Sequence, residues 1–158
     1  MPFRPTAQGW FTGRTRNGRD MFLVFPLVFL ASDGKYYRAP AASSAQLNPS
    51  TDLGSTPTIA WTLGFPPFGD EAPGYVMHDS AYRRTLEVLI SGHEDSPDAV
   101  WLPAGFDRAK ADWLLEDCME SLAIDQSRRA IIYDLLRKFG QQAWDESAPV
   151  YSPGMATT

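Results

Sequence analysis

The 158-residue chain has little of what several protein classes require. It holds one cysteine, Cys118, so no internal disulfide forms and the chain was not built as a disulfide-stapled secreted domain. Asp and Glu number 19 against 14 Lys and Arg, which gives a net charge of -5. Because nucleic-acid binding needs a basic cluster for the phosphates, we expect no nucleic-acid partner. The short run GRTRNGR (13–19) is interpreted as a solvated loop.

Long hydrophobic runs are also missing. The most apolar stretch, MFLVFPLVFLA (21–31), contains Pro26 and is far shorter than the roughly 20 residues that span a bilayer. It is followed by DGKYY and not by a small-residue cleavage site, so it does not have the layout of a signal peptide. We therefore expect neither a transmembrane segment nor a signal peptide, and interpret the stretch as buried strand.

The residues that are present predict one folded domain. Apolar residues make up 44% of the chain and aromatic residues 13%, enough for a single core. Residues 21–32 read as strand, Asp33–Gly34 as a type I′ turn, and residues 35–40 as the returning strand. The Ser-, Pro- and Gly-rich residues 41–58 predict a loop, followed by irregular chain to residue 74.

Three helices are expected after residue 74. The first is predicted over 74–91, followed by a loop over 92–106, and the next two begin at the N-caps Asp107 and Asp125. The apolar spacing assigns an inward face to each helix: Tyr75, Asp79, Tyr82, Leu86 and Leu89; then Ala111, Leu115, Cys118 and Leu122; then Ile132, Leu135, Leu136, Phe139 and Ala143.

Strands followed by helices indicate an α+β fold, with an N-terminal β-hairpin or small antiparallel sheet and about three packed helices. The expected organisation is an extended arm (1–20), one domain (21–145) and an extended tail (146–158).

The stretch GYVMHDSAYRR (74–84) holds His78, one of only two histidines in the chain. The other, His93, lies in a polar loop and is assigned no role. Asp79 falls on the inward face of the predicted helix, where a carboxylate must be paired, hydrogen-bonded or bound to a cation. His78 and Asp79 are about 100° apart round the helix, so they face different partners. Tyr82 lies close to both.

Several further acids are candidate partners for this pair: Asp52, Asp70, Glu71 and Asp112. A histidine oriented by one carboxylate can act as a general base on water. A second carboxylate, Asp79 with Asp52 as its candidate companion, can hold a calcium ion together with loop carbonyls. The alternative is a core histidine with a polar neighbour, because a His-Asp dipeptide on a helix often occurs by chance.

The ordered segments TDLGSTP, FPPFG, HDSAY, KADWLLEDCM and YDLLRKFGQQAW resemble a family of short uncharacterised proteins of tailed bacteriophages and prophages. The resemblance covers about residues 20–145. It implies a virion or host-cytoplasm location, and phage or host protein partners that bind through the N-terminal arm and the C-terminal tail. The chain departs from the family pattern at Gly54, where the family has alanine, and at Thr58, where it has arginine.

A more distant likeness is to the phospholipase A2 superfamily, which places His-Asp-x-x-Tyr on one helix and an aspartate on a second, antiparallel helix. The likeness implies that His78 is the general base and that Asp112 orients it. Tyr82 would hydrogen-bond Asp112, Asp79 would bind calcium, and a loop within 64–69 would supply carbonyl ligands. This chain lacks the disulfides of the secreted enzymes and their Gly-x-Gly calcium loop.

Two functions therefore stay open at this point. One is a bacteriophage virion or tail-associated structural or accessory protein in which the His-Asp cluster is structural. The other is a small hydrolase, similar to phospholipase A2, acting on an ester in a lipid or another substrate. A His-Asp metal phosphohydrolase is disfavoured because no histidine precedes His78, and a serine hydrolase using Ser55 or Ser80 lacks the Gly-x-Ser-x-Gly motif.

Overall fold

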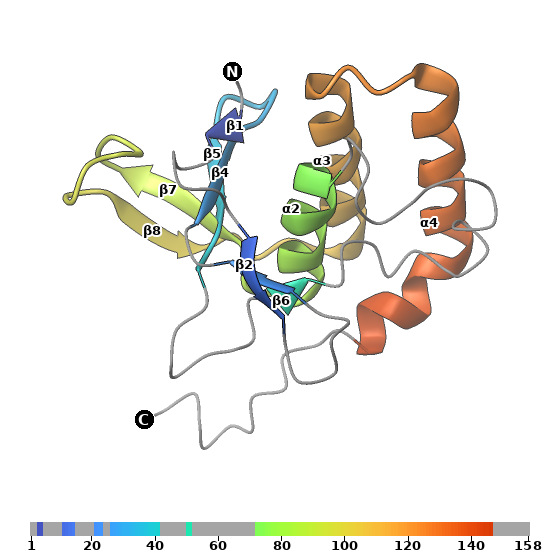
Figure 1. The fold of residues 1–158 in the computed structure, drawn as a ribbon, viewed down its shortest axis with the longest axis horizontal. Helices are drawn as coiled ribbons and strands as arrows, with labels where there is room; N and C mark the ends of the chain where they lie inside the picture. Colours follow the sequence, from blue (N-terminus) through green and yellow to red (C-terminus); the bar gives the residue numbers. More distant parts are fainter. Residues whose placement is uncertain are drawn as a thin grey trace.

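A computed structural model describes residues 3–4, 11–14, 21–23, 26–41, 50–51 and 72–146 (Figure 1). The larger of its two antiparallel sheets has the strand order β1-β4-β5-β7-β8. These strands are β1 (Phe3–Arg4), β4 (Leu27–Leu30), β5 (Tyr36–Ala39), β7 (Glu87–Ser91) and β8 (Val100–Pro103). The smaller sheet consists of β2 (Phe11–Arg14), β3 (Met21–Leu23) and β6 (Ser50–Thr51) in that order.

The described helices are α2 (Ala72–Tyr82), α3 (Arg108–Ser121) and α4 (Gln126–Glu146). Figure 1 shows α2 between the larger sheet and α3, with α4 on the side of α3 away from the sheet. The expected α+β class is confirmed, but the β7–β8 hairpin lies between α2 and α3 in the chain, so the strands do not all precede the helices. None of the described helices has the length and hydrophobicity needed to cross a membrane.

The predicted hairpin around Asp33–Gly34 is present. β4 and β5 pair with Leu30 opposite Tyr36, and residues 31–35 connect them. Gly34 has φ +82°, whereas Asp33 is not among the described residues with positive φ, so the connection is a longer loop and not a two-residue type I′ turn. Backbone hydrogen bonds from Gly34 N to Ala31 O and from Ala31 N to Lys35 O close this loop.

The predicted helix over 74–91 is wrong in its second half. α2 ends at Tyr82, and Arg84 takes a left-handed conformation with φ 58°. Arg84 N donates to Ala81 O and Thr85 N donates to Ser80 O, which is the hydrogen-bond pattern of a Schellman C-cap. Glycine normally marks such a cap, and because arginine stands here instead, no local signal predicts where α2 ends. The β-branched residues that follow pair as β7, and part of the predicted loop 92–106 is strand β8.

The starts of α3 and α4 are confirmed. Asp107 accepts a hydrogen bond from Lys110 N, and Asp125 accepts from the backbone N–H groups of Ser127 and Arg128. Cys118 is buried in the core, and burial raises the pKa of its thiol well above the ordinary value. The prediction that Phe139 on α4 faces inward was wrong. Phe139 is 50% exposed, because Ile132, Leu135 and Leu136 already fill the face that meets α3.

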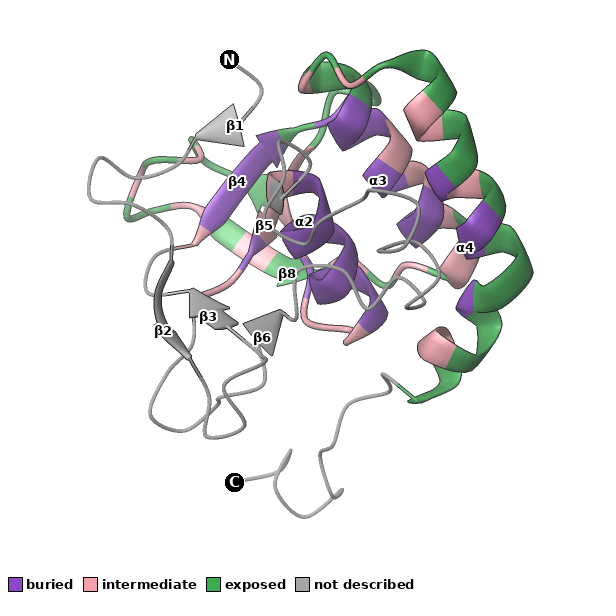
Figure 2. Ribbon diagram, turned by 45° about the vertical axis from the view of Figure 1, so that its right-hand side comes forward, coloured by how far each residue is buried: buried purple, intermediate pink, exposed green. Residues whose placement is uncertain are grey.

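The core surrounds α2. Every residue from Gly74 to Tyr82 is buried, so α2 is covered on all sides (Figure 2). On one side lie the inward residues of the sheet, such as Phe29 and Tyr37, and on the other lie residues of α3 such as Leu114. A helix in this position brings polar groups such as His78 into the interior, where each needs a partner.

Close packing of α2 on α3 depends on Gly74. A Cβ atom at this position would lie 3.2 Å from Leu115 Cδ1 and 3.3 Å from Cys118 Cβ. The absence of a side chain therefore lets the two helix backbones approach each other, which sets the distance that the polar side chains of the two helices must bridge.

The proposed domain boundaries stay predictions. Within residues 1–20, the described segments Phe3–Arg4 and Phe11–Arg14 are strands that pair with β4 and β3. Residues 147–158, most of the predicted tail, lie outside the described residues.

Candidate functional site

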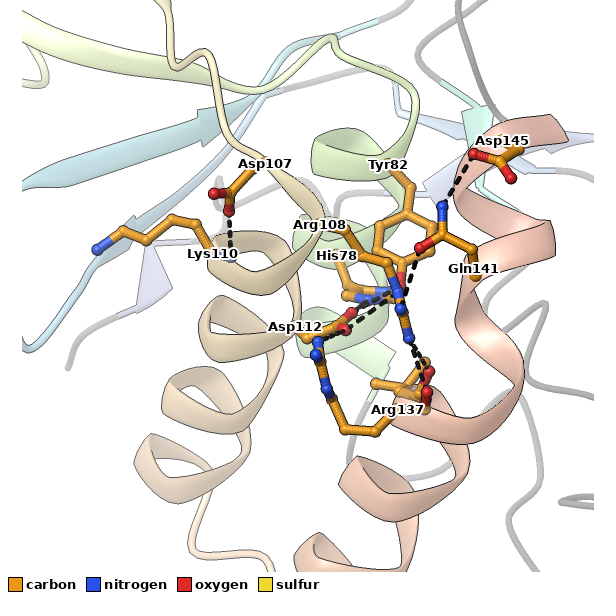
Figure 3. A network of polar contacts seen from close by, with 10 residues as sticks. His78, Tyr82, Asp107, Arg108, Lys110, Asp112, Arg137, Gln141 and Asp145 are labelled. Carbon is orange, nitrogen blue, oxygen red and sulfur yellow. Dashed lines mark hydrogen bonds and ion pairs between the residues drawn. The ribbon is translucent and has the colours of Figure 1, made fainter.

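The buried carboxylate of Asp112 is the centre of a polar cluster between α2, α3 and α4 (Figure 3). Asp112 is fully buried on α3, and His78 is 5% exposed on α2. His78 Nε2 lies 3.0 Å from Asp112 Oδ1, and Tyr82 Oη donates to the same oxygen at 2.6 Å. His78 and Tyr82 reach one atom because they are four residues apart on the same face of α2.

The second oxygen of Asp112 faces two arginines. Arg137 on α4 donates from Nη1 to Oδ2 at 3.3 Å. Arg108, one turn before Asp112 on α3, places Nε 3.7 Å from Oδ2 as an ion pair. The two oxygens of Asp112 therefore face four cationic or hydrogen-bonding side chains drawn from three helices, which compensates for burying the charge.

These contacts determine the ionisation of Asp112. Burial by itself raises the pKa of the carboxyl, but the hydrogen bond and charge of His78, the Tyr82 hydroxyl and the charge of Arg108 together hold it below its ordinary value. Asp112 is therefore a carboxylate at neutral pH and only accepts hydrogen bonds. It follows that Nε2 of His78 carries a proton and that, in the neutral form of the ring, the lone pair is on Nδ1.

Burial, followed by the hydrogen bond to Asp112, raises the pKa of Tyr82 far above that of a free tyrosine. Tyr82 is therefore a hydrogen-bond donor at neutral pH. Its ring lies 4.1 Å from the His78 ring and meets Trp144 of α4 edge-to-face at 5.2 Å between centroids. Arg84 covers the Trp144 ring at 3.5 Å and donates to Trp144 O at 2.9 Å, which holds the end of α4 beside Tyr82.

The depressed pKa of Asp112 predicts a loss of stability in acid. A carboxyl whose pKa is lower in the folded state than in the unfolded state contributes its full stabilisation at pH values above the unfolded-state pKa of about 3.9. This contribution is lost as the pH falls through the folded-state pKa. Urea unfolding between pH 6 and pH 2.5 should show that the free energy of unfolding falls more steeply with decreasing pH for the wild type than for Asp112→Asn. Equal declines in the two proteins would contradict this prediction.

The structure thus brings together His78, Tyr82 and Asp112, the three residues to which the likeness to phospholipase A2 assigned catalytic roles, with the implied contacts. Their roles stay predictions. The sequence analysis missed Arg108 and Arg137. Arg108 could have been found, because it lies four residues before Asp112 on the same helical face. Nothing in the sequence points to Arg137, whose contact depends on how α4 packs.

The predicted calcium site is not assembled by the described residues. Asp79 is buried on α2, at 5% exposure, but it does not belong to any group of three or more His, Cys, Asp and Glu ligands in this part of the chain. Asp52 and the 64–69 loop lie outside the described residues. Calcium takes six to eight oxygen ligands, so Asp79 alone cannot hold the ion and residues outside the described ones would have to complete the site. No step below depends on this ion.

A second group of ligand-type side chains lies in the β7–β8 loop. His93, Glu94 and Asp95 place ligand atoms within 4.8 Å of one another. The His93 side chain is 66% exposed, and its Nε2 lies 3.4 Å from Glu94 Oε2. His93 and Asp95 are exposed, whereas the Glu94 side chain is 3% exposed. We assign this group no role.

The family described as "Protein of unknown function (DUF1353)" matches residues 28–135, more than half of the chain. The chain belongs to this family. The matched span contains His78, Tyr82, Arg108 and Asp112, whereas Arg137 lies just beyond its end. Comparisons with curated proteins and with solved structures give no significant match.

Proposed function

We propose that this protein is a small hydrolase, similar in its chemistry to phospholipase A2, that cleaves an ester with His78 as general base. The observation that carries the proposal is the contact of His78 Nε2 with the buried Asp112 carboxylate, 3.0 Å long, together with Tyr82 on the same oxygen. This combination fixes the histidine tautomer that a general base needs.

The chemistry follows from that tautomer. Nδ1 accepts a proton from water as the water oxygen attacks the ester carbonyl, and the ring becomes an imidazolium next to Asp112. The imidazolium then gives this proton to the departing alkoxide, which leaves as an alcohol. Asp112 holds the ring and offsets its charge without taking up the proton itself. His78 is 5% exposed, so its ring is largely shielded from bulk water.

The resemblance to tailed-phage and prophage proteins supports a phage-encoded origin, with action in the virion or in the host-cell cytoplasm. A lipid ester is the first substrate to test because of the likeness to phospholipase A2. Calcium bound by Asp79, with Asp52 and loop carbonyls, belongs to the same proposal and is tested by the same assay.

An ester-hydrolysis assay compares the wild type with His78→Gln on chromogenic short-chain and medium-chain esters and on phospholipid vesicles. Glutamine can still donate to Asp112 but is not a base, so we expect turnover to fall by about 100-fold to 10,000-fold. His93→Gln is the matched control and should keep full turnover, because His93 lies in the exposed β7–β8 loop.

Each reaction is run with calcium and with a chelator. If calcium takes part, the chelator and Asp79→Asn should each abolish turnover. The proposal is wrong if the wild type cleaves none of these esters, or if His78→Gln cleaves them as fast as the wild type.

A second candidate is a virion or tail-associated structural or accessory protein that binds other phage or host proteins through its two ends. It is favoured by the two arginines on Asp112, because they offset the negative charge that would otherwise stabilise an imidazolium. In this case the cluster only joins three helices. His78→Gln would then lower stability, and no ester would be turned over.

A further inference from the structure

We infer that Arg108 and Gly140 are positioning residues for His78, through which α4 fixes the Asp112 carboxylate and hence the proton on the histidine ring. The consequence for turnover rests on the proposed function, whereas the effect on the ring proton does not.

Arg108 connects α4 to Asp112. Its Nη2 donates to the backbone oxygens of Leu136 at 2.5 Å and Arg137 at 3.1 Å, and its Nη1 donates to Gln141 Oε1 at 3.2 Å. The guanidinium is therefore held against one turn of α4, and its Nε lies 3.7 Å from Asp112 Oδ2 (Figure 3). The Arg108 side chain is 15% exposed, so water screens this charge only weakly.

Arg137 also contacts Oδ2, but it holds the Asp112 carboxylate less firmly than Arg108 does. Its side chain is 43% exposed, so water competes for the guanidinium. Arg137 links α4 to Asp112 directly, whereas Arg108 does so from α3 through a largely buried guanidinium whose other donors are bound to the α4 backbone.

Gly140 gives Arg108 and Tyr82 room at the same point of α4. A Cβ atom at this position would lie 2.9 Å from Tyr82 Oη and 3.1 Å from Arg108 Nη2. Glycine in a helix interior is less favourable than alanine, so its presence here requires a reason. The reason we assign is that two of the four partners of Asp112, one on each carboxylate oxygen, pack directly against the α4 backbone.

The position of the carboxylate controls His78. If Asp112 turns away, Nε2 loses the acceptor that fixes its proton, and the ring is free to adopt the Nδ1–H tautomer, which has no lone pair at Nδ1. A histidine in the wrong tautomer is a poor general base. The packing of α4 therefore positions Arg108 and Tyr82, these two residues position the Asp112 carboxylate, and the carboxylate fixes the proton on His78.

The test is nitrogen-15 NMR of the histidine rings in the full-length protein. Only two histidines are present, and His93→Gln removes the second set of signals, so the His78 ring is assigned directly. The wild type should show the Nε2–H tautomer with a slowly exchanging proton. In Arg108→Gln and in Gly140→Ala, the Nε2–H signal should weaken and its exchange with water should speed up. Arg108→Lys should restore part of the signal, because the positive charge returns without the contacts to α4.

Arg129→Gln is the matched control. Arg129 is also largely buried, at 19% exposure, and donates to a backbone oxygen, Ile124 O, at 3.1 Å. It makes no contact with Asp112 among the described residues, so the His78 signals should not change in this variant.

The inference fails if folded Arg108→Gln and Gly140→Ala keep the wild-type His78 signals, or if Arg129→Gln changes those signals equally. If Arg108→Gln does not fold, Gly140→Ala decides, since alanine favours the helix. NMR needs no turnover, so the inference can hold even if no ester is cleaved. If the proposed hydrolysis is found, both variants should also lower turnover by about 100-fold, the loss expected from a displacement of about 1 Å at a catalytic group.

Discussion

Asp112→Asn is expected to lower the free energy of unfolding by about 3 kcal/mol, the lower end of the loss measured when one partner of a buried ion pair is removed. Asp112 is fully buried and its two oxygens meet donors on both sides. In either orientation, the asparagine NH2 group faces donors, either His78 and Tyr82 or the two arginines. The charge that neutralises Arg108 is lost at the same time.

Urea unfolding at pH 7 measures this loss, with Asp117→Asn as control. Asp117 is also buried on α3, at 8% exposure, and its Oδ2 accepts a hydrogen bond from Ser32 N at 2.8 Å. The asparagine oxygen can still accept this bond, so we expect a loss of about 1 kcal/mol or less. Equal losses in the two variants would mean that the Asp112 cluster contributes nothing beyond an ordinary buried hydrogen bond.

Phe29→Ala is expected to lower the free energy of unfolding by about 3–5 kcal/mol, the range for deleting a buried phenylalanine ring. Phe29 is fully buried in the middle of β4, in the core cluster that also includes Met77 of α2. The cavity would open on the side of α2 that faces the sheet. Because Met77 precedes His78, we expect the change also to loosen the helix that carries the histidine.

The neighbouring residue supplies the control for this measurement. Leu30 follows Phe29 on β4, points to the other face of the sheet and is 38% exposed. Leu30→Ala should therefore lower the free energy of unfolding by less than about 1.5 kcal/mol. Thermal or urea unfolding of the two variants checks which face of β4 meets the helices, and similar losses would contradict the orientation of this strand.

Local signals predicted the two later helices well. Asp107 and Asp125 are short polar residues directly ahead of an apolar period of 3.6, and both cap a helix as expected. The end of α2 could not be predicted in this way. Arg84 adopts a left-handed conformation that arginine rarely takes, and β7 forms because β5 and β8 are available to pair with it. Strand pairing of this kind depends on residues far away in the chain.

The candidate site also depends partly on local sequence signals and partly on tertiary packing. The sequence by itself determined that His78 and Tyr82 share one face of a helix, because a spacing of four residues is close to one helical turn. It also determined that Asp112 follows Arg108 by one turn. Their convergence on a single carboxylate is implied by a resemblance and not by spacing, and it depends on how closely α2 and α3 approach at Gly74.

Only the tertiary structure decided the contribution of α4. Arg137, Gly140 and Trp144 occupy ordinary positions in a helical pattern, and no local feature connects them with His78. They matter because the packing of α4 on α3 brings Arg137 to Asp112 and places Gly140 against Tyr82 and Arg108. The sequence therefore determined which chemical groups are present and which helix carries each of them. The tertiary packing decided which groups compensate the buried charge, because a carboxylate removed from water must find its partners wherever the chain places them.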